Sequence, residues 1–426
     1  RNGTFRNEES ISSEGKNRAS LSNQSDFSWT LDNLIYYDKE IGKHSFGLTL
    51  LQSATGYHYE ESSMAAEGIP LESAKWNALS KENVSLLDEW NSGLIEKQLL
   101  SYMFRVNYDY NNKYLLTVSG RWDGASQLAE GNKWAFFPSA ALGWRLDQEE
   151  FLKDVTWLNQ LKFRLGVGVT GNSAIDPYQT KGAIVSLYYP FGATLAPGYA
   201  ASEPLIKDGA VAMANKDLSW EKTTQYNIGL DYSVLNGRIS GVLDFYTSRT
   251  TDLLMAMTIP SLNGYTNTYA NVGKTSNIGV DITLNTVNIK TRDFEWSTSI
   301  NAAWQKDKID ELANGKEDDI NNNWFIGQAL GVIYGYECGG LWKEEDVAEM
   351  AKFNAKGHSF QAGMVRPVDQ NGDYKIDPND DRVIIGHTRP RWTFGMTNTF
   401  TYKNFDLSVM MYGRFDYMVD TGGEWQ

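Results

Sequence analysis

One acidic segment of the sequence has the residue types and the spacing that could bind a cation. Residues 369–380 read D-Q-N-G-D-Y-K-I-D-P-N-D. Oxygen-bearing side chains occupy positions one, three, five, nine and twelve of this segment, at Asp369, Asn371, Asp373, Asp377 and Asp380, and Lys375 at position seven offers its backbone carbonyl. A hard cation such as Ca²⁺ takes roughly six to eight oxygen ligands. The spacing therefore makes this segment a candidate Ca²⁺ site.

The segment resembles a calcium-binding loop of the EF-hand or dockerin type, with two departures. Position six is Tyr374, where such loops normally have glycine, and position twelve is Asp380 rather than a longer glutamate, as in dockerins. Asp, Asn, Gly and Pro are also frequent turn formers. A solvated turn without a metal is therefore the alternative interpretation.

Catalytic chemistry has little support in the sequence. It contains no G-x-S-x-G, no H-E-x-x-H and no Walker loop. The single cysteine, Cys338, excludes a disulfide framework and a thiolate zinc site, and the four histidines are not paired at metal-ligand spacing. We therefore expect this protein not to be an enzyme.

Composition and charge further restrict the class of protein to which this chain can belong. The chain has 426 residues and a formal net charge of -14, which argues against nucleic acid as a partner because phosphates attract clustered Lys and Arg. Aromatic residues make up 13%, and the mean hydropathy is -0.44, with no apolar run of about 18 residues that would indicate a membrane-spanning helix. A membrane barrel stays compatible with these values, because only every second residue of a barrel strand must be apolar.

The elements that would position any site are strands with period-2 alternation. In 113–123 one face holds Tyr114, Leu116, Val118, Gly120 and Trp122, and the other holds Leu115, Thr117, Ser119, Arg121 and Asp123. An apolar face with aromatic ends opposite a polar face indicates a transmembrane antiparallel β-barrel with a polar lumen. Twelve segments follow this pattern: 27–37, 44–52, 99–109, 113–123, 136–146, 160–169, 225–232, 238–248, 277–287, 294–305, 392–402 and 405–415.

Short and long connections alternate through these strands. The long segments are 53–98, 124–135, 170–221, 249–276 and 306–391. Outer-membrane barrels have short periplasmic turns and long extracellular loops, whereas a large soluble all-β protein, the alternative, has no reason to place every long loop at one end. We expect short helices near 82–91 and 343–353. The loop aromatics Trp76, Trp90, Trp324 and Trp342 either stack on sugar rings or pack the loops together.

Several motifs, in order, give the chain a family resemblance. They include Gly-Arg-Trp-Asp-Gly-Ala-Ser at 120–126, Trp-Ala-Phe-Phe-Pro-Ser at 134–139, Asn-Lys-Asp-Leu-Ser-Trp-Glu at 215–221, Tyr-Asn-Ile-Gly-Leu-Asp at 226–231 and Tyr-Ala-Asn-Val-Gly at 269–273. Together with Asp-Gln-Asn-Gly-Asp at 369–373, they resemble SusC/RagA-type TonB-dependent transporters along nearly the whole chain.

The resemblance implies an outer-membrane barrel of about 22 strands, of which this chain (1–426) would form about twelve. A plug and a TonB-interacting segment would precede it, and the last strands would follow. The family imports oligosaccharides or peptides in Bacteroidota-type bacteria with a SusD-like surface lipoprotein as lid, driven by TonB with ExbB and ExbD. The alternatives are a passive channel and a surface glycan-binding adhesin.

The polar face supplies the candidates for contact with plug or ligand inside the barrel. They are Arg121, Asp123, Asp231, Asp244 and Asp281. The alternative for each is a solvated or plug-paired lumen residue.

Overall fold

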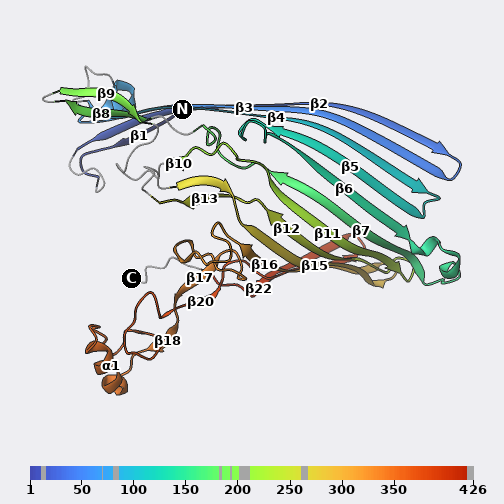
Figure 1. Ribbon diagram of the computed structural model, residues 1–426. Coiled ribbons are helices and arrows are strands. Elements are labelled where there is room, and N and C mark those ends of the chain that lie inside the picture. The colour runs from blue at the N-terminus through green and yellow to red at the C-terminus, as the bar shows by residue number, and fades with distance from the viewer. Residues whose placement is uncertain are drawn as a thin grey trace.

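The computed structural model describes residues 1–10, 16–69, 71–79, 86–181, 185–191, 194–200, 212–260 and 267–419. Within them, one antiparallel sheet of 13 strands dominates, and each strand pairs with the next one of the sheet along the chain. Figure 1 shows this sheet curving through space, with the strands side by side from blue to red. Its strands, in order, are β1 (Asn2–Arg6), β2 (Arg18–Ile41), β3 (His44–Glu67), β4 (Leu86–Tyr110), β5 (Tyr114–Ala125), β6 (Trp134–Arg145), β7 (Leu158–Asn172), β11 (Glu221–Val234), β12 (Ile239–Thr251), β15 (Lys274–Lys290), β16 (Phe294–Glu311), β21 (Trp392–Tyr402) and β22 (Phe405–Phe415).

Local turn chemistry explains the up-and-down order. The β4–β5 turn has Asn111 and Asn112 with φ of 56° and 53°, the left-handed conformation that asparagine tolerates and that a two-residue hairpin requires. The β2–β3 turn places Gly42 at φ 61°. Hairpins of this kind fix the register of their strands, so successive strands pair directly.

All twelve predicted strands are present, and the sheet begins with β1, which was not predicted. The predicted loop 53–98 was wrong, because β3 continues to Glu67 and β4 already starts at Leu86. The helix expected near 82–91 was also wrong at 86–91, which belongs to β4, and residues 82–85 lie outside the described residues. Backbone pairing does not stop where the apolar pattern stops, so polar residues such as Ser62 and Ser63 extend the ladder.

The outward face of the sheet is apolar and has aromatic rows near both ends of the strands. Near the hairpin turns, Tyr114 stacks between Tyr110 and Trp144, with ring centroids 6.4 and 6.5 Å away. Near the long connections, Trp122 packs on Phe136 at 4.2 Å. Tyr114 and Trp122 are eight residues apart on β5, which is about 26 Å at roughly 3.3 Å per residue. This separation is close to the apolar band of roughly 25 Å in membrane barrels.

The connections separate by length, as predicted. The long ones gather at the left end of the sheet in Figure 1 and the short hairpins at the right end, where the β6–β7 connection at 146–157 is the exception in length. The long connections contain further short strands, which are β8 (Val185–Phe191), β9 (Thr194–Ala200), β10 (Ala212–Met213), β13 (Leu254–Thr258), β14 (Asn267–Asn271), β17 (Val332–Tyr336), β18 (Cys338–Leu341), β19 (Val365–Pro367) and β20 (Arg382–His387).

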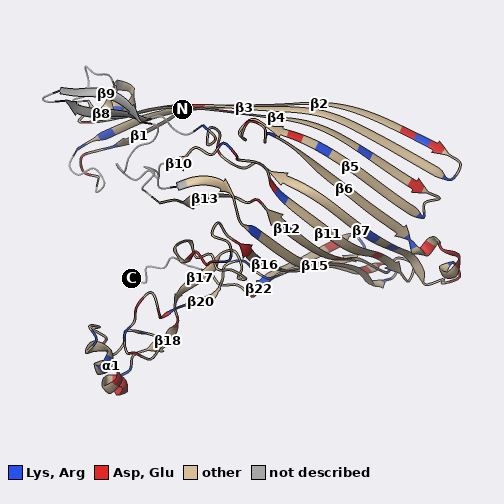
Figure 2. Cartoon of the chain, viewed as in Figure 1, with Lys and Arg blue, Asp and Glu red and all other residues tan. Residues whose placement is uncertain are grey.

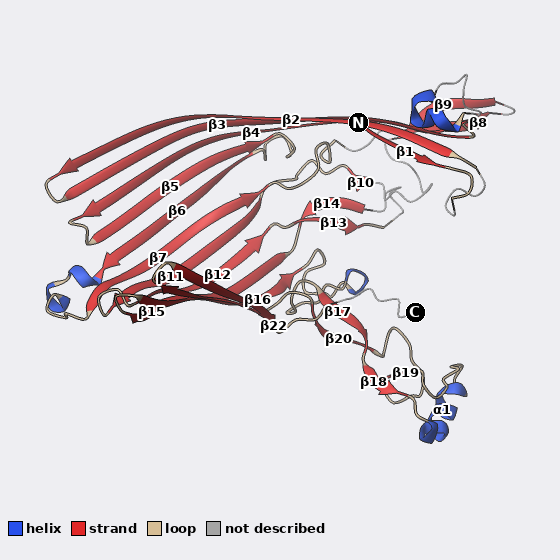
Figure 3. Cartoon of the chain, turned by 180° about the vertical axis from the view of Figure 1, so that it is seen from behind, coloured by secondary structure: helices blue, strands red, loops and turns tan. Residues whose placement is uncertain are grey.

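Helices occur only in connections among the described residues, as the view from behind shows (Figure 3). The helix expected at 343–353 is confirmed as η6 (Glu344–Asp346) followed by α1 (Val347–Asn354). The others are η1 (Glu72–Ala78), η2 (Leu146–Gln148), η3 (Glu150–Leu152) and η5 (Ile320–Asn322). In the described part of the chain, each helix is too short or too polar to cross a membrane. Figure 2 shows long uncharged stretches along the strands.

Candidate functional site

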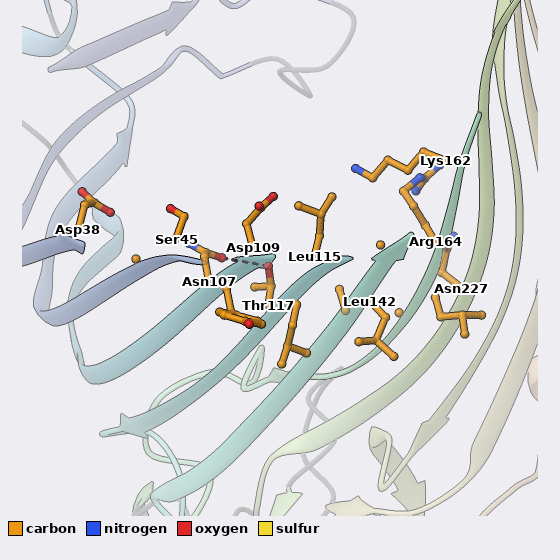
Figure 4. Close-up of a pocket in the computed structure, with 17 residues that line it drawn as sticks. Asp38, Ser45, Asn107, Asp109, Leu115, Thr117, Leu142, Lys162, Arg164 and Asn227 are labelled. Carbon is orange, nitrogen blue, oxygen red and sulfur yellow. Dashed lines mark hydrogen bonds between the residues drawn. The ribbon is translucent and has the colours of Figure 1, made fainter. Parts of the chain in front are cut away.

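The sheet carries a hollow of about 440 Å³ whose lining includes both charged and apolar side chains. Its acidic side chains, Asp38 and Asp109, come from β2 and β4, and its basic side chains, Lys162 and Arg164, come from β7. Figure 4 shows Asp38 on one side of the hollow and Lys162 and Arg164 on the other, with Asn107, Asp109 and Thr117 between them. Asn107 accepts a hydrogen bond from the Thr117 hydroxyl at 2.9 Å. Charges of both signs thus face the interior of the curve.

Arg164 joins two of the predicted lumen residues. Its Nε donates to Asp231 at 2.9 Å, and its Nη2 donates to Asp244 at 3.0 Å. Asp244 lies on β12, so the guanidinium crosses the whole of β11 to reach it. Gly229 of β11 lies beneath it, and a Cβ there would come within 2.6 Å of the guanidinium and of the Asp244 carboxylate. An alanine at this position would therefore force the bridge to shift.

The five predicted lumen residues form two groups on this face. Asp231 and Asp244 meet at Arg164, and Asp281 pairs in register with Asp244 on the next strand. The Arg121 guanidinium instead pairs with Asp123 at 2.6 Å and donates to Ser101 at 2.9 Å.

Register along β6 gives the distance between the two groups. Arg121 is opposite Phe137 of β6 and Arg164 is opposite Gly143, so the groups lie about 20 Å apart along the strands. Sequence reasoning missed Arg164, which lies in the predicted strand 160–169. Its position on the polar face of the strand 160–169 was the available signal.

The long connections are held together by a buried core at their base. Trp220 is buried against Phe137, with ring centroids 5.3 Å apart, and its Nε1 donates to the Lys133 carbonyl at 2.8 Å. The Asn271 amide donates to the Ser219 carbonyl at 2.8 Å and accepts from the Ser219 N–H at 2.7 Å. These contacts join three connections that lie far apart in sequence. Trp220 and Asn271 were part of the sequence motifs but not of the predicted site.

The predicted loop aromatics pack rather than stand free, where the structure describes them. Trp342 is buried with Met350 and Phe353, and the Arg366 guanidinium lies 4.6 Å from its ring centroid. Trp76 packs on the cluster around Ile69. Trp324 is half-buried, and its backbone pairs with Asp319. The backbone of Trp90 lies in β4, but its side chain lies outside the described residues.

The candidate calcium segment forms a tight turn that satisfies its own backbone. Asp369 accepts from the N–H groups of Gly372 and Tyr374, and Asp377 accepts from those of Asn379 and Asp380. Lys375 Nζ donates to Asp377 at 2.8 Å, and this bond, with the two backbone N–H groups, lowers the Asp377 pKa.

Asp381, and not Asp380, is the buried carboxylate of this turn. It accepts from the N–H groups of Gln370 and Asp377 at 2.8 Å each. Sequence reasoning missed this residue, which lies one position beyond the motif. No group of three or more His, Cys, Asp or Glu side chains in the described part of the chain is arranged to hold a metal ion. Calcium binding at this segment stays a prediction.

The β6–β7 connection at the hairpin end contains strongly acidic carboxyls. Burial would raise the pKa of Asp147, but hydrogen bonds from Arg145, Gln148 and the Leu161 N–H outweigh it and lower the pKa to about 2. Glu149 accepts from Tyr114 and Trp144, and the Lys113 ammonium lies 3.0 Å away, which lowers its pKa to about 2. Both carboxylates stay charged and hold the ends of β5 and β6 to the turn.

The comparisons with known proteins agree with this architecture. The model of the family described as TonB dependent receptor-like, beta-barrel matches residues 1–426. The chain belongs to this family. Among curated relatives, the TonB-dependent receptor SusC of Bacteroides thetaiotaomicron is 33% identical over 401 residues, which are 88% of this chain and 36% of the relative. A TonB-dependent receptor of Formosa agariphila is 32% identical over 398 residues, covering 90% of this chain and 38% of the relative.

Solved structures show the same fold in this family. The RagAB peptide importer in its open-open state superposes with a TM-score of 0.79 at 23% identity, covering 95% of this chain and 42% of that one. The predicted resemblance and fold class are therefore confirmed. The chain spans less than half the length of the relatives it matches. Members of the TonB-dependent receptor family are outer-membrane β-barrel proteins, so the concave polar face corresponds to the lumen wall.

Proposed function

We propose that this chain forms part of the barrel wall of a TonB-dependent active importer in the outer membrane of a Bacteroidota-type bacterium. The importer takes up oligosaccharides or peptides. The observation that carries the proposal is the two-sided sheet in a chain of this family: aromatic and apolar outside, charged and polar inside. The similarity to SusC and to the RagAB peptide importer supports the SusC/RagA type. The chain would act as lumen wall and outer loops, without catalysis.

The partners follow from the same proposal. A SusD-like surface lipoprotein would cover the extracellular end as a lid, where the long connections are tied together by the core around Trp220. TonB, energised by ExbB and ExbD, would act from the periplasmic side. Outer-membrane lipid would contact the apolar face. We expect no nucleic acid, since the chain is acidic.

Detergent purification of the full-length protein from native outer membranes, with mass spectrometry of co-purifying proteins, tests the lid. A SusD-like lipoprotein in stoichiometric amount is expected, and a lone barrel would contradict it. Uptake of oligosaccharides and peptides by cells with and without TonB tests whether transport is coupled to energy from the inner membrane. Unchanged uptake without TonB would favour a passive channel, and no uptake in either strain, together with glycan binding at the cell surface, would favour an adhesin.

A further inference from the structure

A second hollow lies among the long connections, away from the concave pocket of Figure 4. Its volume is about 950 Å³, within the upper part of the range of roughly 300–1,000 Å³ typical of ligand sites. We call it the loop groove. Its walls come from three segments: the middle of β4 at 96–98, the β5–β6 connection at 126–133, and the part of the β7–β11 connection at 177–181, with Lys216.

The loop groove is basic in an acidic protein. Its lining contains Lys97, Lys133, Lys181 and Lys216 against two glutamates, a formal charge of +2, whereas the chain as a whole carries -14. None of these four lysines forms an ion pair within the described residues. Several lysines elsewhere do, including Lys153, Lys274 and Lys290. Among the described residues, the groove therefore presents four ammonium groups without an ion-pair partner.

One of the two glutamates of the lining has its partner outside the four lysines, and with Glu130 counted the lining still keeps its net positive charge. The Glu96 carboxylate lies 3.0 Å from His58 Nδ1, outside the set of lysines. Lys97 lies over the Tyr57 ring at 4.8 Å, which leaves its charge intact. Because opposite charges attract most strongly where water is partly excluded, a hollow of this kind favours an anionic ligand.

The groove is preformed rather than an opening between loose loops. Gln98 and Ser126 exchange two hydrogen bonds of 2.8 and 2.9 Å, which fix the second segment to β4. Tyr178 Oη accepts from the Glu96 N–H at 3.2 Å and fixes the third. Leu128, in the floor, is buried in the core around Trp220. Rigid walls reduce the entropy that a ligand loses on binding.

The remaining lining suits a sugar better than a peptide. Hydroxyl and amide side chains alternate with the lysines, at Gln98, Ser126, Gln127 and Thr180. The apolar members Leu128 and Ala129 are each 1% exposed, so these two offer no open surface to a peptide side chain. β4 pairs with β5 only from Leu99 onward, and at 96–98 its second edge bonds to Ser126 and Tyr178, so an added strand would have to displace these bonds. Tyr178, 48% exposed, offers an amphipathic ring instead.

We propose that the loop groove binds an acidic oligosaccharide, one that bears carboxylate or sulfate groups, through Lys97, Lys133, Lys181 and Lys216. The inference rests on the proposed function and gives it a substrate class. Lysine acts here as a point charge, so both kinds of anionic group are accepted. The same groove selects against neutral glycans, which leave the ammonium groups without a partner.

Isothermal titration of the full-length protein in detergent tests the proposal with four probes. They are a tetragalacturonate, a sulfated galactan tetrasaccharide, the neutral maltotetraose and a tetraglutamate peptide. At least one acidic sugar should bind at least tenfold more tightly than maltotetraose. Its affinity should fall as salt shortens the screening length from about 10 Å at 0.1 M to about 3 Å at 1 M. The two acidic sugars distinguish carboxylate from sulfate as the preferred group.

Substitutions locate the site. Lys133→Gln and Lys216→Gln should each weaken binding of the acidic sugar by about two- to fivefold, as for exposed charge pairs. Lys290→Gln, an exposed lysine at the hairpin end, is the matched control and should leave binding unchanged. Equal affinity of the control and groove variants, equal binding of maltotetraose, or no binding of either acidic sugar would overturn the proposal. Tighter binding of tetraglutamate would reassign the groove to acidic peptides.

These outcomes are separate from those of the proposed function. A transporter that co-purifies with a lipoprotein and shows TonB-dependent uptake, but binds neither acidic sugar, would leave the importer standing and refute only the groove. A protein that binds the acidic sugar without TonB-dependent uptake would leave the groove and refute the importer.

Discussion

Replacement of Gly229 by alanine separates the role of the Arg164 bridge from the ordinary effect of a glycine in a strand. In most strands this change stabilises, because glycine loses more backbone entropy on folding and contributes no side chain. At Gly229 the added Cβ would lie 2.6 Å from the Arg164 guanidinium and from Asp244 Oδ1. We therefore expect Gly229→Ala to destabilise the barrel by pushing Arg164 away from Asp244.

The magnitude follows from the bond that is lost. A hydrogen bond to a charged partner contributes about 1.5–3 kcal/mol, and the lower end applies because the Arg164 and Asp244 side chains retain 29% and 20% exposure. The glycine-to-alanine gain of about 0.5–1 kcal/mol opposes it. The net expected loss is about 0.5–1 kcal/mol.

Guanidinium unfolding of the protein refolded into lipid vesicles measures this value. Gly166→Ala on the neighbouring strand is the matched control, because a Cβ there meets Asn227 only at 4.0 Å, and it should stabilise by about 0.5–1 kcal/mol. In an Arg164→Met background, Gly229→Ala should also stabilise. If Gly229→Ala stabilised the protein with Arg164 intact, or if the Arg164→Met background left its effect unchanged, the reasoning would be refuted.

Three further predictions concern the turns and connections. Asp147→Asn should remove about 2 kcal/mol of stability. This contribution is present above pH 4 and is lost as pH falls from about 4 through 2, because the folded pKa of about 2 lies below the ordinary 3.8. Parallel pH–stability curves of variant and wild type would contradict this. Trp220→Phe removes the bond to the Lys133 carbonyl, worth about 1 kcal/mol, and should speed limited proteolysis of the long connections about fivefold; unchanged cleavage would show that the bond is not limiting. Calcium titration of the full-length protein should show one site at 369–380 with a dissociation constant of about 10⁻⁴–10⁻³ M, and Asp373→Asn should weaken its binding. Identical heats of binding for both proteins would show that the segment is a plain turn.

The sequence by itself determined the two faces of the sheet and the direction of its hairpins. Side chains alternate with period two, so the apolar set Tyr114 to Trp122 had to share one face. Asn111 and Asn112 accept the left-handed backbone of a tight turn, so the β4–β5 hairpin could be predicted from its own residues. These signals are local, and the structure confirms them.

Where the strands end was less well determined. The apolar pattern marks the part of β3 and β4 that contacts lipid, but backbone pairing continues past it to Glu67 and from Leu86. Alternation of apolar residues reports the solvent around a strand and not its hydrogen bonds, so the predicted loop 53–98 was too long.

Only the tertiary structure decided which polar residues act together. Arg164 reaches Asp231 and Asp244 across 67 and 80 residues of sequence, and Gly229 leaves the space for that contact. The lysines of the loop groove also come from separate segments of the sequence. Pairing partners in a sheet are set by register and by the packing of connections such as the core around Trp220, and neither is encoded in the spacing of neighbouring residues.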